Sequence, residues 1–430
     1  MRISSGMIFD AGVAGINRQT ASLLHLQQQV SSGRRILTPS DDPVAAAQAL
    51  EVTQASDVVA QFTKNQSAAT STLGLEEAQL SSAGDVLARV RELAIQGGNT
   101  NLSATARKGI AIELRSDFEQ LLGIANATDG TGQHIFAGFM GATTPFGGSV
   151  DNILAGNEIV YQGDDGQRTL QVSPSRFIAV SDSGSDVFKR ISNGNGYFAT
   201  NYANSNTGTA IIATGSVTDP AAWNAATTKN VAVKFTVAAG VTTYDLVDTV
   251  SGNSLLTGAA APAPLVSQRT FQSGQPIVFG QASPPSFDLG ASVTINGVPA
   301  NGDSFSIAPS TSQSVFVTVA KLIGALEAPT GTPAADAKYS SELGFAVTNI
   351  DQATNNVLGV RAQVGSRMRE IDSLSSLTEN VSLQYQQRLS NLQDIDYAKA
   401  ITDLTRAQTG LQAAQQSFAN ISKLSLFNYL

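Results

Sequence analysis

The chain has 430 residues, enough for two or three domains, and only 14% of them are charged, against roughly 25% in an ordinary soluble domain. Its net charge of −8 and the lack of any basic run argue against a nucleic-acid-binding protein. It contains no cysteine, which excludes disulfides, thiolate catalysis and cysteine-ligated metals.

The first 36 residues predict a weakly charged amphipathic helix. Its apolar seam repeats every seven residues through Phe9, Ile16, Leu23 and Val30, and such a seam needs a partner helix. The segment does not read as a secretory signal peptide, because serines, an aspartate and glycines interrupt its apolar residues. No segment approaches the ~20 apolar residues of a membrane span. We therefore expect a protein that is cytosolic or exported without cleavage.

A second helix is predicted for residues 44–97. In the sequence Pro39-Ser40-Asp41-Asp42-Pro43 an aspartate can cap the helix, and Pro43 suits its first position. An apolar seam then continues to Gly97-Gly98, which predicts a helix about 75 Å long at 1.5 Å per residue. A third helix is predicted for residues 103–127. Helices as long as the second are typical of a rod.

Residues 141–335 are rich in Gly, Thr, Ser, Val and Pro, and their short alternating apolar runs predict β structure. Glu158–Gln162 and Arg168–Val172 flank Gly163-Asp164-Asp165-Gly166 and predict a hairpin. Further strands are predicted at residues 231–238, 243–247, 292–295 and 304–307. The Asn- and Gly-rich residues 192–209 are a candidate linker that divides this insert.

The return half predicts a short helix at residues 313–326 and a second rod helix at 338–392, with Leu343, Ile350, Val357, Val364 and Ile371 at strict seven-residue spacing. A final helix at 395–430 has its seam at Tyr397, Leu404, Leu411 and Phe418. The seams of the first and last helices can pack against each other, and so can the seams of the two rod helices.

The expected fold is therefore an α+β multidomain protein, in which both chain ends build a long antiparallel coiled-coil rod around a β-rich domain inserted in the middle. We assign terminal assembly helices to 1–40 and 395–430, the rod to 41–140 and 313–394, and the outward insert to 141–312.

The sequence offers no catalytic, cofactor-binding or metal site. His25 and His134 are the only histidines, and His25 beside the first seam is interpreted as a packing or interface residue. The Asp41-Asp42 and Asp164-Asp165 pairs are interpreted as a helix cap and a turn, and no recognised catalytic motif is present. We therefore expect neither an enzyme nor a cofactor.

The rod seams are enough to close a monomer, so the terminal seams are assigned to assembly. Charge alone predicts that Arg34-Arg35 lies in a solvated loop. A role at an interface is the more specific alternative interpretation. The apolar C-terminus would be an aggregation hazard if it were exposed to water. The candidate assembly residues are Phe9, Ile16, Leu23, Val30, Arg34, Arg35, Leu404, Leu411, Phe418, Ile421, Leu424, Leu426, Phe427 and Leu430.

The motif Val-Ser-Ser-Gly-Arg-Arg-Ile-Leu-Thr-Pro-Ser-Asp-Asp-Pro at 30–43 resembles the N-terminal signature of the bacterial flagellin superfamily. Its Leu-Thr-Pro-Ser form and the C-terminal run from Asp394 to Leu430 are similar to members that join hook to filament. Residues 133–139 and 161–166 add to the resemblance, which covers both helical halves and the start of the insert.

The resemblance implies a structural protein of the flagellum at the hook–filament junction, which adapts hook-associated protein 1 to flagellin by helical head-to-tail assembly. In this family the terminal helices form an inner coiled coil, the rod helices the next shell and the insert the outside. The implied partners are further copies of the chain, hook-associated protein 1, flagellin, an export chaperone and the type III export apparatus. The implied location is the extracellular flagellum, with no nucleic-acid partner and no membrane insertion.

Three alternatives stay open from the residues. A filament-forming flagellin is the first, and residues 37–40 and 425–430 favour the junction protein over it. A secreted adhesin would use the insert, which contains Trp223 but no evident aromatic cluster. An enzyme in the insert has the weakest support, since the two histidines are distant and cysteine is absent.

Overall fold

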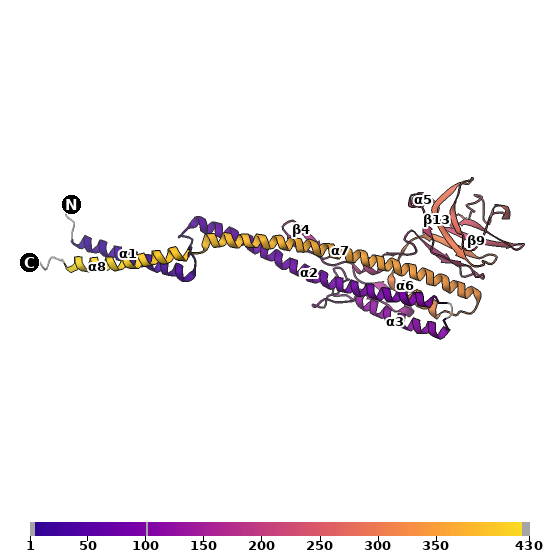
Figure 1. The fold of residues 1–430 in the computed structure, drawn as a ribbon, viewed down its shortest axis with the longest axis horizontal. Coiled ribbons are helices and arrows are strands. Elements are labelled where there is room, and N and C mark those ends of the chain that lie inside the picture. Colours follow the sequence, from indigo (N-terminus) through magenta and orange to yellow (C-terminus); the bar gives the residue numbers. More distant parts are fainter. Residues whose placement is uncertain (1–4, 100–101, 424–430) are drawn as a thin grey trace, which may run out of the picture. The chain divides into compact units, whose positions relative to one another are not determined.

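A computed structural model describes residues 5–99 and 102–423. It confirms helices at both ends of the chain and a β-rich middle (Figure 1). The main helices are α1 (Ser5–Ser32), α2 (Pro43–Gly97), α3 (Ala104–Ala125), α6 (Val315–Glu327), α7 (Pro333–Gln393) and α8 (Tyr397–Lys423). Shorter turns of helix are α4 (Val150–Leu154), η1 (Ser185–Lys189), α5 (Pro220–Ala225) and η2 (Leu265–Ser267). Each helix predicted from the sequence is present, and its described ends lie within about five residues of the predicted bounds, whereas residues 424–430 of the predicted final helix lie outside the described residues.

The chain forms two compact units. The terminal unit comprises residues 1–67, 171–176 and 372–430, and the central unit comprises 68–170 and 177–371. The domain boundaries expected from the sequence stay a prediction.

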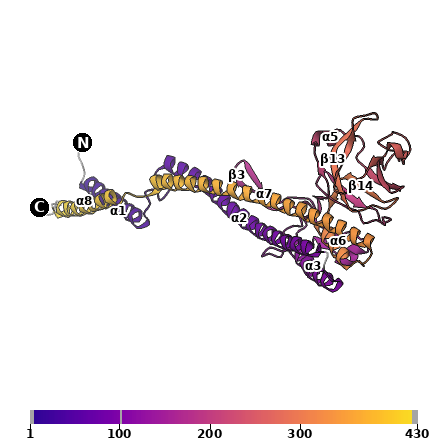
Figure 2. The ribbon, with the colours of Figure 1, turned by 45° about the vertical axis from the view of Figure 1, so that its right-hand side comes forward.

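The long helices follow their seven-residue pattern. In the central unit Leu73, Leu80 and Leu87 of α2 are buried. The seam residues of α7 are buried as well, namely Leu343, Ile350, Val357, Val364 and Ile371. Figures 1 and 2 both show this part of α2 beside α7. The ion pairs Arg361–Glu77 at 2.7 Å and Arg91–Asp351 at 2.6 Å connect the same two helices. The predicted rod core is therefore confirmed in this unit.

The expected start of α2 is confirmed by its hydrogen bonds. Pro43 is its first residue, and the Ala45 backbone N–H donates to Asp42 Oδ1 at 3.0 Å. Proline suits this position because the first N–H groups of a helix have no partner within it.

Aromatic packing joins the shorter helices to the loops of the central unit. Phe118 of α3 and Phe316 of α6 have ring centroids 5.7 Å apart. Phe146 and Phe188 both pack on Phe316, and Phe136 packs on Phe188. All five rings are buried, so this cluster packs Phe136, Phe146 and Phe188 against α3 and α6.

The insert contains two sheets around one hydrophobic core. A five-stranded sheet has the order β11-β10-β9-β14-β6, and a second sheet has the order β12-β13-β7, with β8 also paired to β13. Phe235 and Phe305 of the first sheet and Phe279 and Val293 of the second belong to the shared core. The strands of these sheets are β6 (Phe198–Tyr202), β7 (Ile211–Ile212), β8 (Ser216–Val217), β9 (Val231–Ala238), β10 (Val241–Asp248), β11 (Arg269–Thr270), β12 (Pro276–Gln281), β13 (Phe287–Asn296) and β14 (Ser304–Pro309).

The hairpin predicted around residues 163–166 is wrong. Strand β2 (Val160–Tyr161) pairs with β1 (Phe146–Gly147), whereas β3 (Thr169–Ser173) pairs with β4 (Arg176–Ala179). The reason is that Asp164 bonds outside its own turn, since its Oδ1 accepts the Phe139 N–H at 3.0 Å. The turn is therefore held by a distant loop instead of by cross-strand pairing.

The candidate linker at residues 192–209 contains a strand of the five-stranded sheet. Strand β6 pairs along its length with β14, and β5 (Ile191–Ser192) pairs with β15 (Ser312–Gln313). The glycines and asparagines form the turn before β6, where Gly194 and Gly196 have φ of 60° and 87°. Their composition therefore reflects turn geometry.

Candidate assembly surface

The two terminal helices pack against each other within the terminal unit (Figures 1 and 2). Their half-buried residues follow the predicted seams, with Ile16, Leu23 and Val30 on α1 and Leu404, Leu411 and Phe418 on α8. The rings of Phe9 and Phe418 lie 5.0 Å apart and are tilted by 49°. The structure therefore brings these seam residues into one helix pair, whereas Tyr397, the first residue of the predicted C-terminal seam, is 53% exposed.

Small residues let the two helices approach closely. A Cβ atom added to Gly12 would lie 2.8 Å from the Phe418 ring. Beside this contact is a groove of about 520 Å³, lined by residues of both helices that include Gly15, Gln19 and Ala414. Gly12 was not predicted as a contact residue, although its place three residues after Phe9 is where a second seam position would fall.

The outward side of the helix pair carries apolar side chains that the seven-residue repeat does not predict. Leu24 on α1 and Ile401 on α8 are each 53% exposed. Neither belongs to the seven-residue repeat, so a search for heptads does not select them. Phe9 is 51% exposed despite its contact with Phe418. The helix pair thus keeps apolar surface available after α1 and α8 have paired.

The connectors between α1 and α2 and between α7 and α8 are bonded to each other. The Arg35 N–H donates to Gln393 O at 2.6 Å, and the Ile395 N–H donates to Gly33 O at 3.0 Å. Arg34 forms an antiparallel bridge with Asp394. The predicted site residues Arg34 and Arg35 therefore lie where the α1–α2 connector meets the α7–α8 connector.

Arg35 also uses its side chain within the chain. Its guanidinium donates to Leu392 O at 2.9 Å and forms an ion pair with Asp42 at 3.2 Å. This geometry gives Arg35 a structural role in holding the connectors. Arg34 is exposed on the same connector.

The Asp41-Asp42 pair acts through hydrogen bonds to the backbone. Asp41 Oδ2 accepts the Leu37 and Thr38 N–H groups at 2.9 and 2.8 Å, and its Oδ1 lies 3.2 Å from His25 Nε2. The Thr38 N–H is the main cause that lowers the pKa of Asp41, and the Ala45 N–H is the main cause that lowers the pKa of Asp42. Both carboxylates therefore favour the charged form that caps this turn.

Some predicted assembly residues lie outside the described part of the chain. These are Leu424, Leu426, Phe427 and Leu430, and the side chain of Ile421 near the end of α8. The assembly role of every predicted site residue stays a proposal.

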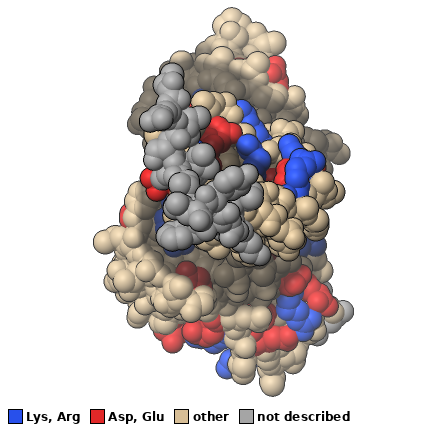
Figure 3. Space-filling model, turned by 90° about the vertical axis from the view of Figure 1, so that its left-hand side faces the viewer, with Lys and Arg blue, Asp and Glu red and all other residues tan. Residues whose placement is uncertain are grey.

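The charged side chains of the described residues do not gather into one patch on the face seen in Figure 3. Among the described residues visible in Figure 3, most side chains are uncharged, and the Lys, Arg, Asp and Glu side chains lie in small groups of both signs. Within residues 5–99 and 102–423, His, Asp and Glu side chains form no group of three placed to hold a metal ion. None of the helices in these ranges combines the length and apolar character needed to cross a membrane.

The paired terminal helices agree with two family comparisons. Residues 3–140 match the bacterial flagellin N-terminal helical region, and residues 347–430 match the bacterial flagellin C-terminal helical region. The fold and the terminal helix pair therefore define a protein of the bacterial flagellin superfamily.

Full-length relatives narrow this class. The chain is 25% identical over 428 residues to flagellar hook-associated protein 3 of Salmonella typhimurium, and the match covers 99% of both chains. It is 31% identical to the crystal structure of flagellar hook-associated protein 3 from Legionella pneumophila, with a TM-score of 0.71 over 79% of this chain and 98% of that chain. The Xanthomonas campestris FlgL structure is 32% identical, with a TM-score of 0.67 over 79% of this chain and 99% of that one.

The chain belongs to the flagellar hook-associated protein 3 family, the hook–filament junction proteins. It is a structural component of the bacterial flagellum, and these relatives favour the junction protein over a filament-forming flagellin.

Proposed function

We propose that this protein adapts hook-associated protein 1 to flagellin at the hook–filament junction, through helical head-to-tail assembly of its terminal helices. Copies of the chain form a short zone on hook-associated protein 1, and flagellin adds to the far side of that zone. This role needs no catalytic group, and the protein performs it outside the cell.

We also propose that the chain leaves the cell through the flagellar type III export apparatus with its N-terminus uncleaved. A cytoplasmic chaperone holds α8 before export. The apolar seam of α8 supports this step, because Leu404, Leu411 and Phe418 would be exposed if α8 were separated from α1.

One observation carries the assembly proposal: α1 and α8 use their seams on each other and still present apolar side chains outward. Exposed Leu24 and Ile401 lie on the two paired helices. Burying a large apolar side chain contributes roughly 1.5–3 kcal/mol. A neighbouring subunit that covers these side chains therefore gains stability without disturbing the seams.

The test compares charged with apolar side chains at the outward positions. Leu24→Glu and Ile401→Glu put carboxylates at the proposed contact, and the controls Leu24→Met and Ile401→Leu keep an apolar side chain at the same exposed positions. Hook fragments ending in hook-associated protein 1 are incubated with each variant, and bound chain is measured by sedimentation. We expect the first two variants to bind at least about tenfold more weakly, and the controls to bind like the unmodified chain.

Two results would contradict the proposal. If Leu24→Glu and Ile401→Glu bind as well as the unmodified chain, the outward surface takes no part in assembly. Long filaments formed by the unmodified chain alone would indicate a filament protein. Circular dichroism of each variant is the control for intact helices, because weak binding by a folded variant reflects the changed surface and not misfolding.

A further inference from the structure

The two sheets of the insert have edge strands at β11 and β12. Among the described residues, β11 pairs only with β10, and β12 pairs only with β13. An edge strand leaves backbone N–H and C=O groups free, and such a row of groups is a template for pairing with another chain. Strand β11 has two residues and β12 has six, so β12 is the edge of these two that a further strand can use.

A single side chain covers the free edge of β12. Arg269 of β11 donates from Nη1 to the Val278 carbonyl at 3.1 Å and from Nη2 to the Gly280 carbonyl at 2.7 Å. These carbonyls are two positions apart, and alternate carbonyl groups of a strand point to the same edge. The guanidinium therefore takes two successive acceptors that an added strand would use.

Two further features suit this edge to an arginine. The backbone of Arg269 is fixed in β11, where it lies opposite Tyr244 of β10, so its side chain reaches from one sheet to the other. Its planar fork presents charged N–H donors in a fixed geometry, and charge-assisted hydrogen bonds are stronger than neutral ones. Pro276, two positions before Val278, has no N–H and removes one donor from the same edge. The edge of β12 is therefore occupied from within the chain.

We propose that Arg269 takes the place of a neighbouring strand and prevents β12 of one copy from pairing with β12 of a second copy. The edge of an antiparallel strand can pair with itself, because a two-fold axis places the N–H groups of each copy opposite the carbonyls of the other. Val278 is 50% exposed on this strand, so pairing would also bring two apolar side chains together. This contact is one that the chain avoids, and it is separate from the proposed assembly through the terminal helices.

The chain has no cysteine, so a thiol placed on β12 reports pairing directly. Val278→Cys puts that thiol at the covered edge. It is made once with Arg269 present and once with Arg269→Gln, whose shorter amide lacks the charged fork. Each purified full chain is treated in solution with bismaleimidoethane, a short bifunctional thiol crosslinker, and the covalent dimer is measured by mass spectrometry. Association through the terminal helices is common to all chains, so the comparison isolates residue 269.

Two matched controls accompany this pair of chains. Val266→Cys combined with Arg269→Gln places the thiol at a side chain that is 95% exposed on the insert, and it measures chance encounters. Lys234→Gln combined with Val278→Cys removes one positive charge from an exposed position of the same insert while Arg269 stays in place.

We expect Arg269→Gln to raise the dimer yield at position 278 at least about tenfold over the chain that keeps Arg269, because one charge-assisted hydrogen bond is worth about that factor. Both controls should stay at the level of the chain that keeps Arg269. Equal yields at position 278 with and without Arg269 would overturn the proposal. An equal rise at position 266 would do so as well, because it would indicate general association instead of pairing at β12.

A second variant separates the covered edge from the fold of the insert. Arg269→Lys keeps the positive charge but offers one ammonium group in place of the fork, so we expect its dimer yield to lie between those of the arginine and glutamine chains. Trp223 is buried in the core of the insert, and its fluorescence spectrum should be the same in all three. If the dimer forms only in chains whose Trp223 spectrum has changed, Arg269 supports folding alone and the proposal is wrong.

Discussion

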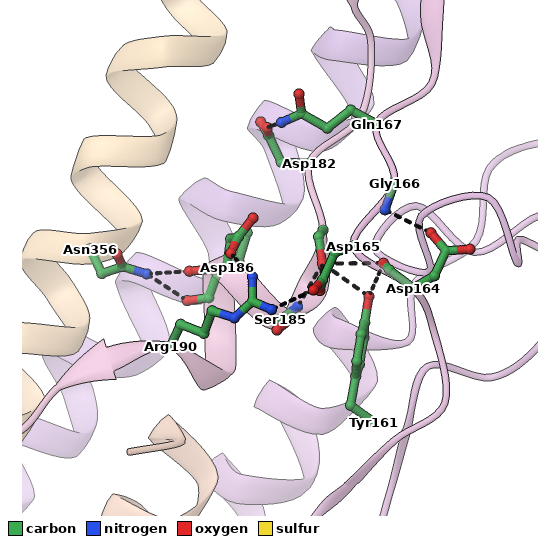
Figure 4. Close-up of polar contacts among 12 residues, drawn as sticks. Tyr161, Asp164, Asp165, Gly166, Gln167, Asp182, Ser185, Asp186, Arg190 and Asn356 are labelled. Atoms are coloured by element: carbon green, nitrogen blue, oxygen red, sulfur yellow. Dashed lines mark hydrogen bonds and ion pairs between the residues drawn. The ribbon is translucent and has the colours of Figure 1, made fainter. Parts of the chain in front are cut away.

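A buried acidic group on α2 should make the central unit less stable as the pH rises. Glu76 is fully buried, and its Oε1 accepts the Asp182 backbone N–H at 3.0 Å. Its other oxygen has no hydrogen-bond partner. The Asp182 carboxylate is already bound by Arg367 at 2.7 and 2.9 Å and by Gln167 at 2.8 Å (Figure 4 shows the last contact). Arg367 can neutralise one carboxylate of the pair, but not both.

Burial, followed by repulsion from Asp182, raises the pKa of Glu76 from 4.5 to about 8. The folded protein therefore keeps a proton on Glu76 that the unfolded chain releases above pH 4.5. Stability falls wherever the unfolded state binds fewer protons, so the free energy of unfolding decreases between pH 4.5 and pH 8. At about 1.4 kcal/mol per pH unit, the loss is on the order of 3 kcal/mol by pH 7.

Glu76→Gln removes the ionisation and keeps an oxygen that can accept the Asp182 N–H. We expect this variant to match the unmodified protein near pH 4.5 and to be more stable by about 3 kcal/mol at pH 7. Urea unfolding at several pH values measures the difference, followed by far-UV circular dichroism, which reports the rod helices. Trp223 fluorescence is unsuitable for this purpose, because that side chain is buried in the core of the insert.

The control is Glu51→Gln, which changes an exposed glutamate on the same helix. Burial also raises the pKa of Asp117 and of Glu342. These groups titrate in both proteins, so the difference between Glu76→Gln and the unmodified chain isolates Glu76. Parallel loss of stability in the two proteins from pH 5 to pH 8 would refute the reasoning.

Three further predictions concern the terminal unit. Gly12→Ala places a methyl group 2.8 Å from the Phe418 ring, so it should weaken the α1–α8 pair and speed proteolysis of both helices, and an unchanged cleavage rate would contradict this. Arg35→Gln removes the ion pair with Asp42 and a hydrogen bond to Leu392 O. It should speed proteolytic cleavage at the two connectors, while the melting temperature of the central unit changes by no more than about 1 °C. An unchanged cleavage rate would contradict the role of Arg35 in holding the connectors together. In dilute monomer, amide exchange should be faster in α1 and α8 than in residues 68–97 of α2, because their seams are only half-buried, and equally strong protection of the terminal helices would contradict this expectation.

Residue patterns alone located the long helices because their cause is local. Leu343, Ile350 and Val357 recur every seven residues, so each helix has one apolar side whatever its partner is. The same pattern contains a sign of the buried acid. Glu76 lies three residues after Leu73 and four before Leu80, which places a carboxyl group on the buried side of α2.

The assembly surface was only partly readable from the sequence. The repeat selected Leu404, Leu411 and Phe418, and the structure places them between α1 and α8. The outward residues Leu24 and Ile401 do not follow the repeat, so they emerged only once the helix pair fixed which sides face away.

The sequence by itself determined the order of elements, the positions of the long helices and the flagellin-like ends, because periodicity, caps and motifs act over a few neighbouring residues. Only the tertiary structure decided how the turn at 163–166 is held, where β6 pairs and which apolar residues stay exposed. Those features depend on contacts such as Asp164 with Phe139 and β6 with β14, between residues 25 and about 100 positions apart. No local pattern encodes a contact at that separation, since either partner could be satisfied by many other residues.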